Sequence, residues 1–153
     1  MSTASVVLGL NAKLYRNTGT QQSPTWTEIA NVKDVTLNLE KGEADATTRA
    51  SSGWRQTVAT LKDASVEFEM VWDPSDQGFQ AIKDSFFNDT AIDIAVMDGP
   101  LPPASGETSQ GLRAQWAVTK FSRNEPLEEV LTVSVSIKPT YGSVPKWMIE
   151  TGT

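Results

Sequence analysis

Apolar and polar residues alternate along much of the chain, and this alternation predicts antiparallel strands. Residues 65–72 (SVEFEMVW) place apolar side chains on one face and Glu67 and Glu69 on the other. Residues 130–138 alternate in the same way. A period of two residues is typical of strands that bury one face. Five further segments show a weaker strand pattern, namely 14–16, 35–39, 54–61, 92–96 and 112–121. Together these segments predict a mainly β fold of about seven strands.

One segment follows helical spacing instead. Residues 73–76 (DPSD) offer a capping side chain and a proline suited to the first helical turn. The spacing predicts a helix over about 74–88 that flanks the sheet and ends at Asn88-Asp89. Its apolar face is expected to comprise Phe79, Ile82, Phe86 and Phe87.

Three segments lack a clear place in this pattern. Residues 40–53 join two predicted strands, yet they are longer than the about two to five residues that a hairpin needs. We interpret this segment as a functional loop. The terminal segments 1–10 and 142–153 contain short apolar stretches, at 5–10 and 144–149, where polar residues are usual. We expect them to be arms on a single domain of residues 1–153, docked either on a neighbouring copy or on the chain itself.

The composition excludes several kinds of catalytic site, metal site and binding partner. The chain of 153 residues contains no cysteine and no histidine, which excludes thiolate zinc sites and catalytic triads that use histidine. Its formal net charge of −6 argues against a nucleic-acid binder, because neutralising phosphates requires clustered cations. No apolar run is long enough to span a membrane, and no signal peptide is recognised. We therefore expect a protein made in the cytoplasm, without a membrane partner.

Charge is distributed unevenly. Residues 1–62 hold seven cations and five anions, a balance of +2, whereas residues 63–98 hold nine anions and only Lys83, a balance of −8. Residues 99–153 hold five of each. A head-to-tail contact that stacks indefinitely needs two different, complementary surfaces, and these two segments of opposite charge could supply them.

The remaining acids offer little for catalysis or metal binding. Glu67 and Glu69 lie side by side on one predicted strand, whereas glycosidase carboxylates face each other across a cleft. Asp73, Asp76 and Asp98 match no calcium-loop spacing, and capping or turn roles explain them better. No glycine-rich phosphate loop occurs. We expect no enzyme activity, no metal and no cofactor.

The five tryptophans leave one alternative open. Trp72 and Trp116 lie within predicted strands and are expected in the core. Trp26, Trp54 and Trp147 lie at strand starts or in the tail, where the rings can be exposed. Exposed rings serve either a carbohydrate-binding β-sandwich module or contacts between subunits, where tryptophan is enriched.

An ordered series of short segments resembles the major tail tube proteins of long, non-contractile-tailed bacteriophages. The series lies within roughly residues 30–141 and comprises 42–49 (GEADATTR), 53–55 (GWR), 60–70 (TLKDASVEFEM), 78–83 (GFQAIK) and 121–128 (FSRNEPLE). The resemblance implies an antiparallel β-sandwich or flattened barrel with one flanking helix. It also implies hexameric rings that stack into a hollow tube for DNA ejection. The type VI secretion tube protein has a similar fold and is the alternative.

The resemblance also implies partners and a location. The partners would be copies of the chain itself, the tape-measure, tail-terminator and distal-tail proteins, and DNA that passes without being bound. The protein would lie in the virion tail, and in the host cytoplasm before assembly.

Three sets of residues are assigned on this basis. The loop that reaches a neighbouring subunit would present Gly42, Glu43, Asp45, Thr47, Thr48, Arg49 and Trp54. Carboxylates facing the bore would repel phosphate, and the candidates for this acidic lumen are Glu67, Glu69 and Asp93. The candidate anchors of the two arms are Leu8, Leu10, Trp147 and Met148.

Overall fold

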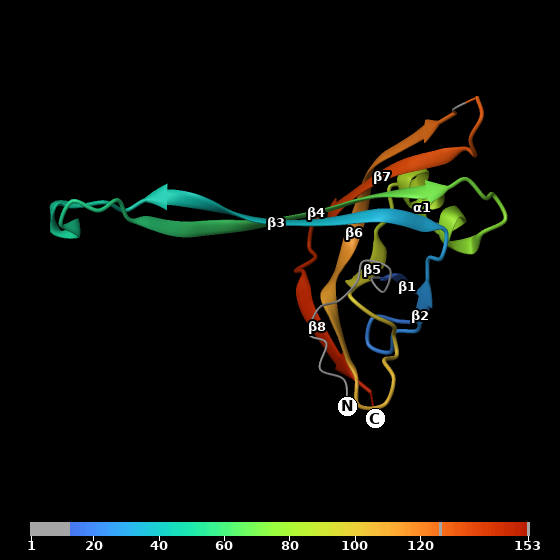
Figure 1. Ribbon diagram of the computed structural model, residues 1–153, viewed down its shortest axis with the longest axis horizontal. Helices are drawn as coiled ribbons and strands as arrows, with labels where there is room; N and C mark the ends of the chain where they lie inside the picture. Colours follow the sequence, from blue (N-terminus) through green and yellow to red (C-terminus); the bar gives the residue numbers. More distant parts are fainter. Residues whose placement is uncertain (1–12, 126, 153) are drawn as a thin grey trace.

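The computed structural model describes residues 13–125 and 127–152, which form an antiparallel eight-stranded sheet flanked by one α-helix (Figure 1). This confirms the predicted mainly β fold with its single flanking helix. The helix is α1 (Gln77–Asn88), and a short 3-10 helix covers Arg49–Ser51. The strands are β1 (Lys13–Asn17), β2 (Trp26–Glu28), β3 (Val32–Asp45), β4 (Thr57–Val71), β5 (Ile92–Met97), β6 (Thr108–Asn124), β7 (Thr132–Pro139) and β8 (Lys146–Thr151).

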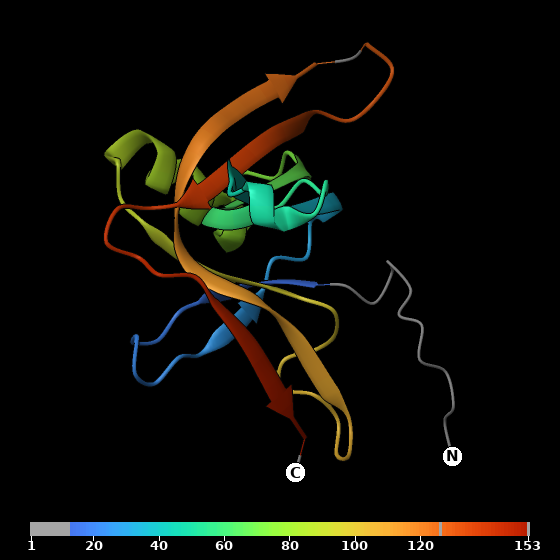
Figure 2. The same cartoon turned by 90° about the vertical axis from the view of Figure 1, so that its left-hand side faces the viewer.

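The sheet curls around the core but does not close. Its strand order is β2-β1-β5-β6-β7-β4-β3, and β8 pairs with the first part of β6. Within the described residues the end strands β2 and β3 do not pair with each other, so the sheet is not a barrel. Figure 2 shows how β6 runs through both halves of the molecule, beside β8 at one end and β7 at the other. A register shift between Val118 and Lys120 lies near this change of partner.

Both halves of the sheet contribute to one hydrophobic core. Leu14 of β1 and Ile94 of β5 belong to the same buried cluster as Val66 of β4 and Val135 of β7. Trp116 lies fully buried in this cluster, and its indole N–H donates a hydrogen bond of 2.9 Å to the Ile94 carbonyl. A buried indole needs such a partner for its N–H group. The inner faces of the two halves therefore face each other, and their outer faces point away from each other.

The helix α1 begins three residues later than the sequence pattern predicts. Residues 73–76 form a turn, and the Asp76 carboxylate then caps the helix by accepting a hydrogen bond of 2.8 Å from the Phe79 backbone N–H. Phe79 and Ile82 are buried as expected, whereas Phe87 is exposed. Consecutive helical residues point about 100° apart, so Phe86 and Phe87 cannot both face the core. No helix among the described residues has the length and hydrophobicity to cross a membrane.

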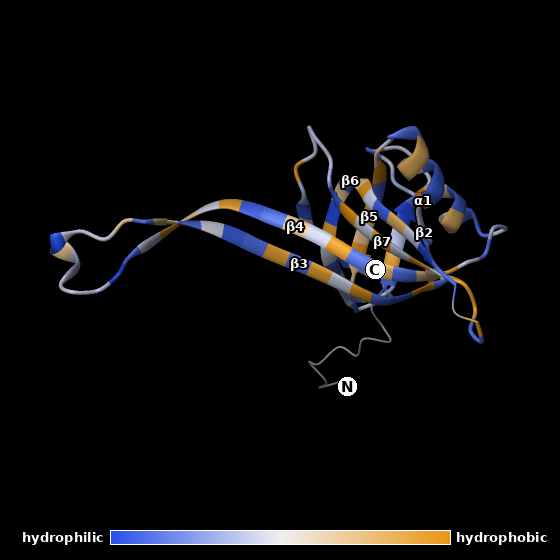
Figure 3. Ribbon diagram, turned by 90° about the horizontal axis from the view of Figure 1, so that it is seen from above, coloured by the Kyte–Doolittle hydropathy of each residue, from blue (hydrophilic) through white to orange (hydrophobic). Residues whose placement is uncertain are grey.

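The predicted loop over residues 40–53 begins later than expected, because residues 40–45 belong to β3 and only residues 46–56 connect β3 to β4 at the end of a long β-hairpin. β3 continues to Asp45 and β4 begins at Thr57, and their register pairs Asp45 with Thr57. We call residues 42–61 the arm. It projects far from the body of the molecule (Figures 1 and 3). Nearly every residue of the arm is exposed, so neither face is buried and no alternation marks the strands.

The C-terminal segment docks on its own chain. Of the expected arm 142–153, residues 146–151 form β8, which pairs with residues 108–113 of β6. This is the second of the two alternatives that the sequence left open. The N-terminal segment 1–10 lies outside the described residues.

Candidate assembly surfaces

The acids first considered as metal ligands have local structural roles. The Asp73 carboxylate accepts hydrogen bonds from the backbone N–H and the hydroxyl of Ser75. The Asp98 carboxylate accepts one of 2.8 Å from the backbone N–H of Gln110, and Asp76 caps α1. In the described part of the chain, no three acidic side chains gather closely enough to hold a metal ion.

The arm brings the predicted interface residues together at one end of the molecule. Gly42, Glu43 and Asp45 lie on β3, and the rest follow in the turn and the 3-10 helix, namely Thr47, Thr48, Arg49 and Trp54. The indole of Trp54 is 76% exposed. The structure thus displays this set on a surface that is remote from the core.

A hydrogen-bond network orders the end of the arm. Backbone and hydroxyl groups of Thr47 bond to Asp45 and Gln56, and the Ser51 hydroxyl donates to the Gln56 side chain over 2.9 Å. The backbone N–H of Thr48 in turn donates to the Ser51 hydroxyl. Sequence reasoning missed Ser51 and Gln56, because nothing in the sequence marks their contact.

One titratable group takes part in this network. The hydrogen bonds from Thr47 lower the pKa of Asp45 below its ordinary value. The ionised form therefore stabilises the turn above that ordinary value, and the stabilisation is lost as the pH falls through the lowered pKa.

The arm leaves apolar side chains in water. Leu61 is 85% exposed, and Trp54 and Val58 are each more than half exposed. The outer edge of β3 has no strand paired to it among the described residues. A long two-stranded ribbon with exposed apolar side chains and a free edge is only marginally stable alone and is a ready template for a partner. The arm is therefore the strongest candidate for contact with another copy.

Glu67 and Glu69 lie together on the outer face of β4. Glu67 is exposed and Glu69 is half-buried. In the sheet register Lys33 lies opposite Glu69, and Ser136 lies between Glu67 and Lys120 in one row across three strands. This outer face, formed by β3, β4, β7 and the second half of β6, thus carries carboxylates with lysines beside them.

The structure does not bring Asp93 together with those two acids. Asp93 lies on the outer face of β5, in the other half of the sheet. Its carboxylate accepts two hydrogen bonds from Arg113, of 2.8 and 3.2 Å, and one of 3.0 Å from Asn17. The Arg113 guanidinium also stacks over Trp26 at 4.9 Å. The Asp93 and Arg113 side chains are only 10% and 19% exposed, so this is a partly buried structural ion pair.

Replacement of Asp93 should destabilise the fold. Asp93→Ala leaves the Arg113 guanidinium partly buried without its carboxylate, and we expect the free energy of unfolding to fall by about 3 kcal/mol. Urea denaturation followed by circular dichroism measures the change. Glu67→Ala, on an exposed position, is the matched control and should change stability by less than about 0.5 kcal/mol. Equal effects of the two substitutions would show that the ion pair contributes nothing.

Two of the candidate anchors of the terminal segments, Trp147 and Met148, lie in β8 and hold this strand on its own chain. The Trp147 indole N–H donates a hydrogen bond of 3.0 Å to the Gln110 side chain. Met148 packs against the small outer cluster that includes Tyr15 and Met97. Leu8 and Leu10 lie outside the described residues.

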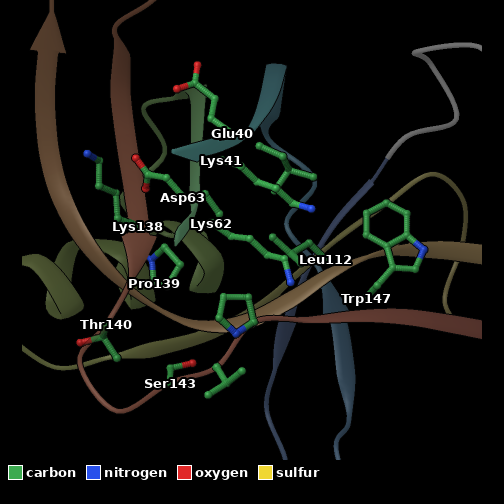
Figure 4. Close-up of a pocket in the computed structure, with 14 residues that line it drawn as sticks. Glu40, Lys41, Lys62, Asp63, Leu112, Lys138, Pro139, Thr140, Ser143 and Trp147 are labelled. Carbon is green, nitrogen blue, oxygen red and sulfur yellow. The ribbon is translucent and has the colours of Figure 1, made fainter. Parts of the chain in front are cut away.

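A groove of about 950 Å³ lies where the arm leaves the body (Figure 4). We call it the basal groove. Its lining combines residues from β3, β4, β6, β7, β8 and the β7–β8 connection. The charged lining residues are Glu40, Lys41, Lys62, Asp63 and Lys138, and the apolar ones include Leu39, Leu112, Val144 and Trp147.

The three tryptophans proposed for sugar stacking do not form one surface. Trp26 is half-buried beneath Arg113, Trp54 lies on the arm, and Trp147 lines the basal groove. A carbohydrate-binding platform would need such rings side by side. The arrangement gives no support to that alternative.

Comparisons with known proteins point to one class of assembly. A family model described as "Phage tail tube protein" matches residues 11–140. No protein sequence with curated function matches the chain. The fold is also similar to the folds of subunits in three solved assemblies.

The tail of an empty gene transfer agent particle superposes with a TM-score of 0.67 at 13% identity, covering 92% of this chain and 99% of that one. The SPP1 tail tube gives 0.66 at 16% identity, covering 95% and 82%. The sheath–tube complex of an extracellular contractile injection system gives 0.65 at 6% identity, covering 97% and 94%. At such identities, the likeness concerns the fold.

Proposed function

This chain belongs to the phage tail tube protein family, and from that premise we propose that it is the repeating subunit of a hollow tail tube. Copies would close into hexameric rings, and the rings would stack. The tail of the gene transfer agent, whose subunit has a similar fold, is described with C6 symmetry. The proposed partners are other copies of the chain, with the tape-measure, tail-terminator and distal-tail proteins at the ends, all in the virion tail.

The arm is the observation that carries this proposal. It extends beyond the body, contributes no residue to the core, and exposes Trp54 and Leu61. A monomer gains little from such a ribbon, because its strands bury almost no apolar surface. A neighbouring subunit that covers it would bury those side chains and pair the free edge of β3.

We propose that the outer face of β3, β4, β7 and the second half of β6 lines the bore. Glu67 and Glu69 would then face the DNA during ejection and repel its phosphates, so that the DNA passes without being held. Asp93 is not part of this proposal, since Arg113 neutralises it on the other half of the sheet. The role is structural, and no catalytic step is assigned.

The similar fold in the sheath–tube complex of an extracellular contractile injection system supports the alternative of a type VI-like tube. The match to the phage tail tube family over residues 11–140 favours the phage tail. Both alternatives require self-association of the chain.

Self-association gives the first test. Sedimentation velocity over a range of protein concentrations should show monomers at low concentration and very large species above a threshold. Head-to-tail contacts that do not close on themselves give such a threshold. Monomers at every concentration, also after a tail-assembly initiator is added, would contradict the proposal.

A further inference from the structure

A second exposed apolar site lies far from the arm, at the end of the β6–β7 hairpin. We call residues 127–130 the acidic tip. Leu127 is 99% exposed and Val130 is more than half exposed. Glu128 and Glu129 lie between them and form no ion pair with any residue that the structure describes. An apolar residue exposed this fully between carboxylates suits a contact with a surface that is both apolar and basic.

The basal groove offers such a surface. Lys41 and Lys62 are direct cross-strand neighbours in the register of β3 and β4, and both point into the groove (Figure 4). Like charges placed opposite each other destabilise a strand pair. Neither lysine forms an ion pair within the described residues. Carboxylates placed between the two ammonium groups would relieve their repulsion.

The neighbouring acids lie on the opposite face of the hairpin. Glu40 and Asp63 are also cross-strand neighbours, one position along from the two lysines. Since successive side chains of a strand point to opposite faces, the acids and the lysines are separated by the ribbon. Figure 4 shows Glu40 directed away from Lys62. Glu40 and Asp63 nevertheless border the groove, where the three lysines Lys41, Lys62 and Lys138 outnumber them.

Apolar side chains complete the match. Leu39, Val144 and Trp147 line the groove, and each is more than half exposed. Leu127 and Val130 of the acidic tip would cover them. The tip and the groove therefore combine opposite charges with apolar area on both sides, which is the composition of a specific protein contact.

We propose that the acidic tip of one copy docks in the basal groove of a second copy. Glu128 and Glu129 would bind Lys41 and Lys62, and Leu127 would pack near Trp147. The β6–β7 hairpin ends away from the base of the arm (Figure 1), where the groove lies, so each copy can offer both surfaces. Such a contact joins two different surfaces, so it can repeat head to tail from copy to copy. This inference rests on the proposed self-assembly and identifies a contact additional to the arm.

Cysteine cross-linking tests the contact directly, because the chain contains no cysteine of its own. Lys62→Cys and Glu129→Cys are combined in one chain, which is then assembled and oxidised. We expect a ladder of disulfide-linked dimers, trimers and longer chains on a non-reducing gel. Either substitution alone should give no ladder, because a ladder needs two cysteines per chain. Lys62→Cys with Asp84→Cys, an exposed acid on α1, is the matched control and should also give none.

Charge exchange tests the chemistry of the same contact. Lys41→Glu with Lys62→Glu, or Glu128→Lys with Glu129→Lys, should each raise the threshold concentration for assembly at least about tenfold. All four substitutions together should bring the threshold concentration most of the way back to the wild-type value. Asp84→Lys with Glu107→Lys makes the same charge change as the tip variant at exposed positions outside both surfaces. This control variant should assemble at a threshold concentration within about twofold of the wild-type value.

The outcomes separate this inference from the proposed function. Tubes that form normally but lack the 62–129 cross-link would overturn the contact alone. A ladder from Lys62→Cys with Trp54→Cys instead would mean that the arm of a neighbour occupies the groove, which also overturns it. A wild-type chain that stays monomeric would overturn both.

Discussion

Replacement of the arm by a short turn should leave a folded domain that no longer assembles. Lys41 and Lys62 are register partners, so an Asn-Gly turn of two residues can replace residues 42–61 and still close the hairpin. The deleted residues contribute nothing to the core, and almost all are exposed. We expect the free energy of unfolding to change by less than about 1 kcal/mol. The assembly threshold should rise at least about 100-fold, because the exposed apolar side chains and the free β3 edge of the arm are lost.

Urea denaturation and sedimentation velocity on the same preparation measure the two effects. Trp54→Ala in the intact arm provides an intermediate case, with a weaker but detectable loss of assembly. A truncated chain that forms tubes at the normal threshold would show that the arm is not an assembly surface. A truncated chain that fails to fold would show that the arm supports the body, contrary to its lack of core contacts.

Reversal of the proposed bore charges should slow DNA passage rather than assembly. Glu67→Lys with Glu69→Lys replaces two carboxylates with two ammonium groups in every subunit. A basic lining would bind phosphates and release counterions, so we expect release of DNA from purified virions to slow at least about tenfold at low salt. The rate should recover as salt is raised, because added ions screen and compete with these contacts.

Two control variants test whether slower DNA release comes from cations at residues 67 and 69. Glu67→Gln with Glu69→Gln removes charge without adding cations and should give a smaller effect. Glu107→Lys with Glu150→Lys makes the same charge change near the β6–β8 end and should leave release unchanged. Equal release rates for the Glu67/Glu69 lysine variant and the wild type at every salt concentration would remove those two residues from the bore.

The sequence predicts those parts of the fold in which one face of an element is buried. The alternation around Phe68 and the helical spacing of Phe79 and Ile82 both reflect the core, and the structure buries all three. The arm escaped prediction as a hairpin because water surrounds both of its faces, and alternation then has no cause. The short strands β2 and β8 escaped because a few exposed residues carry too little pattern.

The candidate surfaces were predictable only where they are local in sequence. Residues 42–54 could be assigned to an interface from their resemblance to one family, and the structure shows them gathered on the arm. The basal groove joins Leu39 to Trp147 across more than half of the chain, so only the folded structure brings them together. The pairing of Asp93 with Arg113 likewise depends on the register of β5 and β6, which a single sequence does not specify.

Electron microscopy of the purified, concentrated protein tests the central claim most directly. We expect hollow tubes of uniform diameter built from stacked rings, in which the arm of each subunit lies against another subunit. Discrete single molecules whose arm folds back on their own body, under conditions that drive related tubes to assemble, would contradict it.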